Sequence, residues 1–382
     1  MRTTMATENN NKTLNVPNLR FPEFSGEWER SSLGVVFCKV ENGLTYDPNN
    51  SEGLPVTRIE TISDRSINYK RVGYAKDDGK LSKYKMEPGD ILFSHINSLK
   101  HIGKTAYYDG EHPLYHGMNL LLLRTTNEES ARFLFYQLNT SRFLHRCQVL
   151  ANQAVNQASI NTRELKGITL HKPSIKEQIK IADFISLLDN HIATQIKIIE
   201  KLESLIKGLC QKLTQQDNPN TALNDTLVCY SSTLQESSVQ EAGDYPVYGA
   251  TGVCGYTDTP EVDGDSILII KDGASVGVTY YASGKYSAIG TLNRLAAKRG
   301  YSLRYLYYCL KVFNFAPYRT GLAIPHIYFR DYGKAKVWCP SLDEQQRIAD
   351  ALSKVELKIA IEKSLLEQLY SQKRFLLQAM FI

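Results

Sequence analysis

Four histidines lie within 22 residues and form the densest group of potential metal ligands in the sequence: His95, His101, His112 and His116. They do not form the helical zinc pair of metalloproteases, and we expect them on a turn-rich polar surface. The seven cysteines are widely spread and include no C-x-x-C pair, which disfavours zinc and fits reduced thiols in a cytosolic protein.

Catalytic motifs are absent or fragmentary. Glu356-Leu357-Lys358 matches the short E-x-K fragment of nucleases, but it falls mid-helix with its two charges on different faces. The segment 272–277 resembles a phosphate loop but precedes a predicted strand, whereas such loops open a helix. There is no P-loop, no aminomethyltransferase tetrapeptide, no glycine-rich adenosylmethionine motif and no recognisable nucleophile triad. A P-loop ATP motor is therefore excluded.

The elements that would position any site are organised around a repeat. Residues 173–213 and 340–380 align without a gap at a constant offset of 167. The identical pairs include Pro173/Pro340, Ser174/Ser341, Glu177/Glu344, Gln178/Gln345, Ile181/Ile348, Ala182/Ala349, Asp183/Asp350, Ile192/Ile359, Glu200/Glu367 and Leu202/Leu369. A period of nearly half the chain indicates a duplicated unit.

Each copy is predicted to be one long helix. The Ser of the Pro-Ser start suits an N-cap, and the Glu three residues later suits a capping box. Apolar residues then follow a 3-4 rhythm that favours coiled-coil pairing along helices of roughly 60 Å. The predicted pairing residues are Ile185, Leu188, Ile192, Ile199, Leu202, Leu352, Val355, Ile359, Leu366 and Leu369, with Lys363 and Lys373 interrupting the second seam.

Each helix follows a predicted α+β globular unit. In the first unit, strands are expected near 91–96, 104–109 and 119–124, and helices over 130–148 and around 161–165. The second unit has its elements in the same order: 262–270 corresponds to 87–93, 276–282 to 102–108, 303–310 to 131–138, and 327–341 to 160–174. The fold class is α+β: two similar units separated by two long antiparallel helices, with an internal pseudo-twofold repeat.

The predicted divisions are a disordered tail (1–16), the first unit (17–172), the first helix (173–215), a linker with the second unit (216–338) and the second helix (339–382). The net charge of +5 permits an anionic partner without demanding one. The N-terminus lacks an apolar core and no apolar run approaches 18 residues. We therefore expect neither secretion nor membrane spanning, and a cytoplasmic location.

Five segments resemble specificity subunits of type I restriction-modification enzymes. They are PNLRFPEFSGEW (17–28), DYPVYGATGVCGY (244–256), KDGASVGVTYY (271–281), TGLAIPHIYFRDY (320–332) and PSLDEQQRIADALS (340–353). The first half carries QAVNQASIN (153–161) where the second has TGLAIPHI, so its recognition domain belongs to a different class.

The resemblance implies a function. Each globular unit would be a target recognition domain for one half of a split, asymmetric DNA target in a bacterial or archaeal cell. The helices would set the spacing and dock two methyltransferase subunits, and restriction subunits would join that core. Catalysis would lie in the partners, so adenosylmethionine, ATP and Mg are expected there and no cofactor on this chain.

DNA-contacting residues are expected on loops rich in hydrogen-bond donors. In the first unit the candidates are Asn97, Lys100, His101, Lys104, Asn119 and Gln153. In the second they are Tyr248, Thr251, Lys271, Asp272, Ser275, Arg319 and His326. The tyrosines at 280, 281, 305, 307 and 308 are better explained by core packing than by base stacking.

Two other functions stay open. A methyltransferase or endonuclease with unrecognised motifs would be active as the purified chain. A coiled-coil scaffold would bind no DNA at any salt concentration, whereas specific DNA binding weakens steeply as salt rises.

Overall fold

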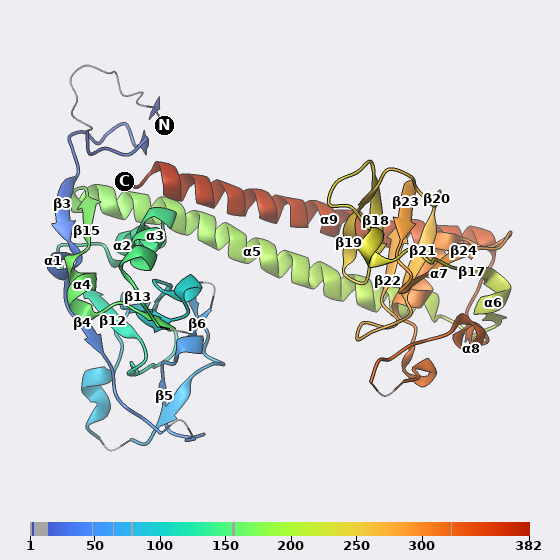
Figure 1. The fold of residues 1–382 in the computed structure, drawn as a ribbon, viewed down its shortest axis with the longest axis horizontal. Helices are drawn as coiled ribbons and strands as arrows, with labels where there is room; N and C mark the ends of the chain where they lie inside the picture. The colour runs from blue at the N-terminus through green and yellow to red at the C-terminus, as the bar shows by residue number, and fades with distance from the viewer. Residues whose placement is uncertain are drawn as a thin grey trace. The chain divides into compact units, whose positions relative to one another are not determined.

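The computed structural model describes residues 2–3, 14–47, 49–63, 65–77, 79–154, 157–321 and 323–382 (Figure 1). It divides into a first unit, Met1–Ala193 with Glu367–Ile382, and a second unit, Thr194–Leu366. The two predicted long helices are α5 (Ile175–Thr214) and α9 (Leu342–Ala379). Each unit therefore takes one part of both helices.

The predicted tail lies mostly outside the described residues. Its Arg2–Thr3 form strand β1, which pairs with β2 (Leu19–Arg20). Within the described ranges, none of the helices combines the length and apolar character that a membrane crossing requires.

An antiparallel sheet in the order β11-β9-β12-β4 forms the centre of the first unit. Its strands are β4 (Phe37–Asn42), β9 (Ile91–Phe93), β11 (Thr105–Tyr107) and β12 (Leu121–Thr125). Three pairs of strands lie outside this sheet: β3 (Glu29–Ser32) with β15 (Thr169–Lys172), β5 (Leu54–Val56) with β8 (Gly73–Ala75), and β6 (Ile62–Ser63) with β7 (Ser66–Ile67). A small three-stranded sheet has β14 (Gln157–Ser159) at its centre, between β10 (Ile96–Asn97) and β13 (Asn152–Ala154). The helices are α1 (Leu33–Val36), α2 (Ala131–Leu138), α3 (Ser141–Leu150) and α4 (Thr162–Gly167).

The second unit contains an equivalent sheet in the order β17-β24-β21-β22. Its strands are β17 (Leu227–Ser231), β21 (Ser266–Ile270), β22 (Thr279–Ala282) and β24 (Leu292–Ala297). A second sheet contains β18 (Tyr245–Gly249), β19 (Gly252–Thr257), β20 (Val262–Asp263) and β23 (Lys285–Ala288), and β16 (Thr221–Ala222) pairs with β25 (Lys336–Val337). The helices are α6 (Leu223–Thr226), α7 (Leu303–Lys311) and α8 (Phe329–Tyr332).

The two sheets have the same strand order when strands are matched along the chain. Strands β4, β9, β11 and β12 correspond to β17, β21, β22 and β24, and the pair β3–β15 corresponds to β16–β25. The duplication predicted from the sequence is therefore present in the topology. The α+β class with two long helices is confirmed.

A repeated glutamine joins each globular unit to its helix. In the first unit the Gln178 side chain accepts from the Ser130 N–H (3.0 Å) and donates to the Pro173 carbonyl (3.0 Å). In the second, Gln345 accepts from the Ser302 N–H (3.0 Å) and donates to the Pro340 carbonyl (2.9 Å). Because Ser130 and Ser302 cap α2 and α7, each glutamine fixes the start of a domain helix.

A repeated tyrosine makes a second junction. The Tyr136 hydroxyl donates to Asp189 (2.8 Å), and the Tyr308 hydroxyl donates to Glu356 (2.7 Å). Each acid also accepts from a lysine, Lys373 for Asp189 and Lys311 for Glu356. The buried tyrosines of α7 thus serve packing, as predicted.

Within each unit the two helix segments run antiparallel. In the second unit Gln195 Nε2 donates to the Glu362 carbonyl (3.0 Å), while Cys210 packs in one cluster with Leu352. Of the predicted pairing residues, Ile185, Leu188, Ile192, Ile199 and Leu352 are buried, and Leu202, Val355, Ile359, Leu366 and Leu369 are half-buried. The two lysines that interrupt the seam form ion pairs across the helices, Lys363 with Glu203 and Lys373 with Asp189.

Two local predictions were wrong in detail. The single helix expected over 130–148 is divided at Asn139 and Thr140, because the Thr140 hydroxyl accepts from the Phe143 N–H and begins α3 as an N-cap. The Glu177 carboxylate, expected to close a capping box, instead accepts from Arg20 at 2.7 and 2.8 Å.

Candidate nucleic-acid interface

Four of the candidate DNA-contacting residues lie in and beside the connection between β10 and β11. Asn97 donates to Ser94 Oγ (3.2 Å) and accepts from the Ser98 N–H (2.8 Å), so its amide holds the turn. His101 Nδ1 lies 3.1 Å from Ser98 Oγ. The pKa of His101 is lowered by burial and then by the nearby Lys104 and Lys100. Both lysines are exposed, which makes this connection cationic.

Gln153 joins the same surface through the small sheet. Asn97 on β10 and Gln153 on β13 both pair with Ala158 of β14, one from each side, and Gln153 is exposed. The structure therefore brings Asn97 and Gln153, 56 positions apart in the sequence, onto one sheet.

Asn119 lies in the turn two residues before β12, one residue after Met118. The Met118 carbonyl accepts from Asn42 Nδ2 (2.7 Å). The same Asn42 nitrogen lies 3.2 Å from His95 Nε2. Asn42 is a polar residue of this surface that sequence reasoning missed, because nothing in its local sequence separates it from an ordinary strand end.

Two of the four clustered histidines are buried, contrary to the predicted polar surface. His95 and His116 are 6% and 2% exposed. Burial lowers the pKa of each to about 4, and His116 lowers that of His95 further. At His116 the backbones approach closely, since the Leu44 N–H donates to the His116 carbonyl (2.9 Å) next to Gly43, where a Cβ would lie 1.8 Å from that oxygen.

Five candidates of the second unit come together where the segment after β21 meets the segment before α8. The Ile327 N–H donates to the Lys271 carbonyl (2.9 Å), and Asp272 forms a β-bridge with His326. The Arg319 guanidinium donates to the Val276 carbonyl (3.1 Å). Ser275 is exposed in the same connection. The segment 272–277 precedes strand β22, as the sequence indicated.

Tyr248 and Thr251 lie apart from this group in the sequence, on the β18–β19 hairpin. The Tyr248 ring packs edge-on against Tyr286 at 5.6 Å and is half-buried. Thr251 is exposed at the hairpin tip, and the Tyr280 hydroxyl ties this tip to β22 by donating to the Ala250 carbonyl (2.9 Å).

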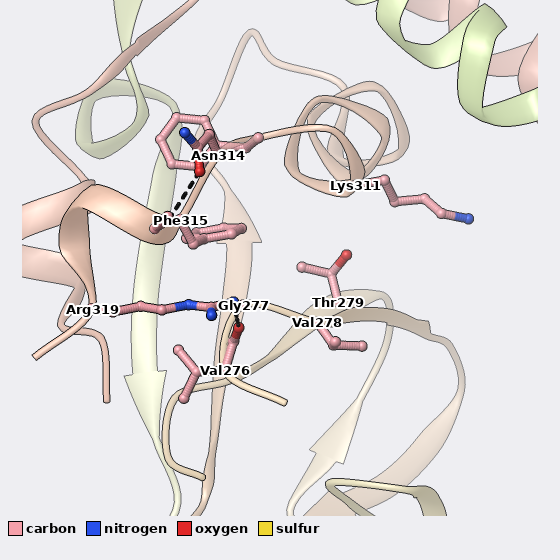
Figure 2. Close-up of a pocket in the computed structure, with 10 residues that line it drawn as sticks. Val276, Gly277, Val278, Thr279, Lys311, Asn314, Phe315 and Arg319 are labelled. Atoms are coloured by element: carbon pink, nitrogen blue, oxygen red, sulfur yellow. Dashed lines mark hydrogen bonds between the residues drawn. The ribbon is translucent and has the colours of Figure 1, made fainter. Parts of the chain in front are cut away.

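A cleft of about 420 Å³ opens beside this group (Figure 2). It lies between the start of β22 and the segment that follows α7, and its charged lining residues are Lys311 and Arg319. Gly277 forms part of the lining with φ +92, and a Cβ there would lie 2.8 Å from the Phe315 ring. Glycine is therefore required for the aromatic ring to cover this turn.

The described residues contain no group of three or more His, Cys, Asp or Glu side chains placed to hold a metal ion. The E-x-K fragment has structural partners: Glu356 binds Tyr308 and Lys311, whereas Lys358 pairs with Glu362. The two charges of the fragment thus point to different neighbours, as expected for different helix faces.

The family described as "Type I restriction modification DNA specificity domain" matches the chain twice, over residues 25–204 and 230–371. The two matches include most of both units and both long helices. The chain belongs to this family. Its duplicated topology is thus a pair of specificity domains.

Similar proteins are also described as type I restriction enzyme specificity subunits. A type I restriction enzyme specificity subunit of Methanocaldococcus jannaschii, MjaX, is 42% identical over 207 residues, which are 53% of this chain and 49% of the relative. The EcoprrI specificity subunit of Escherichia coli is 26% identical over 117 residues, 31% of this chain and 29% of the relative. The alignments thus span half or less of these relatives.

The fold is also that of a solved specificity subunit. The crystal structure of the type I restriction-modification S subunit from M. genitalium covers 96% of this chain and 99% of its own, with a TM-score of 0.64 and 18% identity.

Proposed function

We propose that this chain is the sequence-specific DNA-binding subunit of a type I restriction-modification complex. The observation that carries the proposal is the duplicated specificity domain, with one sheet order occurring twice and each copy joined to a long helix. Each globular unit recognises one half of a split target. Because the first unit carries QAVNQASIN (153–161) where the second carries TGLAIPHI, the two half-sites differ and the target is asymmetric.

The first contact surface consists of Lys100, Lys104 and Gln153, with Asn97, His101 and Asn119 shaping it. The second consists of Lys271, Asp272, Ser275, Arg319 and His326, with Tyr248 and Thr251 on the neighbouring hairpin. Exposed lysine and arginine side chains bind phosphates, whereas amide, hydroxyl and imidazole groups contact base edges.

The helices set the spacing and dock two methyltransferase subunits. Support comes from apolar residues that helix pairing leaves exposed. Leu357, Ile361 and Leu365 follow one another every four residues on α9 and are 62%, 53% and 41% exposed. Such a stripe on a helix is typical of a protein interface.

The chain itself is proposed to be non-catalytic. Methylation and cleavage reside in the methyltransferase and restriction subunits, which bind adenosylmethionine, ATP and Mg, and the complex acts on DNA in the bacterial or archaeal cytoplasm. Methylation by the purified chain alone would contradict this proposal.

The decisive experiment is to coexpress the chain with its methyltransferase subunit and map methylated bases across the host genome. We expect one split, asymmetric motif. Unmethylated DNA in cells that contain the assembled complex would refute the proposal.

Exchange of residues 226–338 for the corresponding domain of another family member tests the division of labour. The methylated motif should change in one half only, because the first unit is left intact. A change in both halves would exclude independent recognition.

A further inference from the structure

Three arginines of the first unit surround the β3–β15 pair. Arg30 on β3 lies opposite His171 on β15, and its guanidinium lies 3.5 Å from Thr169 Oγ1. Arg146 on α3 donates to the Thr169 carbonyl (2.6 Å). Arg142 lies one helical turn before Arg146, since four residues rise about 6 Å. The pKa of His171 is lowered by burial and then by these same three arginines, so their charges lie close together.

Within the described part of the unit, these arginines differ from other cations in having no carboxylate partner. Arg124 pairs with Asp90 and Glu87, and Lys172 pairs with Glu129. Among the residues that the structure describes, no carboxylate lies within ion-pair distance of Arg30, Arg142 or Arg146, and all three are exposed. Like charges held together repel one another, so an anion that binds among them relieves the repulsion.

The outer face of α3 carries this charge toward the predicted DNA surface. Arg142, His145, Arg146 and Val149 follow the i, i+3, i+4, i+7 spacing of one helical face, and all are exposed. Helix α3 ends at Leu150, two residues before β13, whose Gln153 is a candidate base contact. The cationic face and the small sheet are thus consecutive along the chain.

The second unit is built differently at this point. After α7 its chain forms the 3-10 turn Ala316–Tyr318, where the first unit has the ten-residue helix α3. Among the described elements, the helix that bears the cationic face has no counterpart in the second unit, so this face does not follow from the duplication.

We propose that Arg30, Arg142 and Arg146 bind backbone phosphates of double-stranded DNA beside the half-site that the first unit recognises. The inference rests on the proposed function. Guanidinium groups donate to phosphate oxygens in a fixed fork and keep their charge at every relevant pH. DNA fits better than an acidic protein because the helix with the charged face leads, after one residue, into the strand that carries Gln153. Phosphate contacts orient the duplex but carry no sequence information.

The test compares Arg142→Gln/Arg146→Gln with the wild type in the complex assembled with methyltransferase subunits. DNA binding is measured against salt concentration on a target duplex and on an unrelated duplex. Each lost phosphate contact removes about 0.9 from the slope of log K against log salt, so the slope should become shallower by about 2. Affinity for both duplexes should fall by similar factors, and the methylated motif should stay the same.

Arg142→Lys/Arg146→Lys is the matched control, since it keeps both charges and should keep most of the slope. Arg142→Gln alone guards against misfolding, because this side chain is exposed and makes no hydrogen bond or ion pair within the described residues. Its slope should change by about 1.

An unchanged slope in the double variant would overturn the inference while leaving the proposed function intact. Loss of methyltransferase binding with an unchanged slope would instead assign the face to a protein partner and also overturn it. Absence of DNA binding by the wild-type complex at any salt concentration would refute the proposed function itself.

Discussion

The repeated junction glutamines offer an internal comparison of burial energetics. Gln178 and Gln345 are each 1% exposed and make the same two hydrogen bonds to a helix cap and a proline carbonyl. Gln178 makes one more, from Nε2 to the buried Glu129 carboxylate at 2.7 Å. Substitution by leucine keeps the approximate volume of either side chain and removes every bond. We predict that Gln178→Leu destabilises its unit more than Gln345→Leu destabilises the other.

The size of each loss in the free energy of unfolding follows from the backbone groups that the substitution leaves without a hydrogen-bond partner. Gln345→Leu orphans one N–H and one carbonyl, at about 1–3 kcal/mol each. Gln178→Leu orphans the same two groups and removes a hydrogen bond to a charged group, which contributes about 1.5–3 kcal/mol more. The difference between the variants should therefore be about 2 kcal/mol. In a unit of this size that corresponds to a melting temperature about 4–8 °C lower.

Hydrogen exchange resolves the two units in one sample. Amides of α2 report on the first junction and amides of α7 on the second, and about 2 kcal/mol corresponds to roughly thirty-fold faster exchange. Each variant should affect only its own helix. Equal effects, or a larger effect of Gln345→Leu, would show that the Glu129 bond contributes nothing and would refute the reasoning.

Two further predictions concern particular side chains. The pKa values of His95 and His116 are lowered from 6.5 to about 4, so the unfolded chain binds more protons than the folded chain between these pH values. The first unit should therefore lose stability as pH falls from 6.5 to 4, by up to about 3 kcal/mol per histidine. The measurement is proton NMR of the imidazole rings, and a ring that titrates near 6.5 in the folded chain would contradict this prediction. Gly277→Ala places a Cβ against Phe315 at positive φ and should lower the free energy of unfolding of the second unit by more than about 2 kcal/mol. Gly284→Ala is the control, since it is also at positive φ but in open space, and it should lower that free energy by about 1 kcal/mol. Thermal unfolding measures both.

Local signals predicted the regular elements well and failed where a distant residue decided the outcome. Strands β9 and β11 lie inside the predicted runs 91–96 and 104–109, and β12 overlaps the run 119–124 and ends one residue beyond it. Glu177 had the right type and position for a capping box, but Arg20 lies close enough to take both carboxylate oxygens. A charged partner 157 positions away outweighs a local cap, and no window of sequence contains both residues.

The seam lysines illustrate the same limit. Along α9 alone, Lys363 and Lys373 interrupt an apolar pattern and argue against pairing. The facing helix supplies Glu203 and Asp189 at those levels, and the Asp189 contact also includes Tyr136. A break in one heptad seam is therefore informative only once the register of its partner is known, and that register is a property of the antiparallel pair.

The candidate DNA contacts were the hardest part to predict because the chemistry that binds a base also builds a loop. Asn97 and His101 are hydrogen-bonding residues in the right connection, yet their own loop engages both the amide nitrogen and the amide oxygen of Asn97 and one ring nitrogen of His101. Arg142 and Arg146 look in the sequence like the solvated face of an ordinary amphipathic helix. Only the fold reveals that three arginines lie close together with no carboxylate of the described residues beside them. Residue type alone cannot predict such a lack of neutralising partners, because it depends on which side chains are neighbours in space. Unpaired charge in the folded unit is therefore a better guide to phosphate contacts than the number of hydrogen-bond donors along the chain. It supports the proposal that such contacts lie on α3, just before β13, and outside the loops that the motifs suggested.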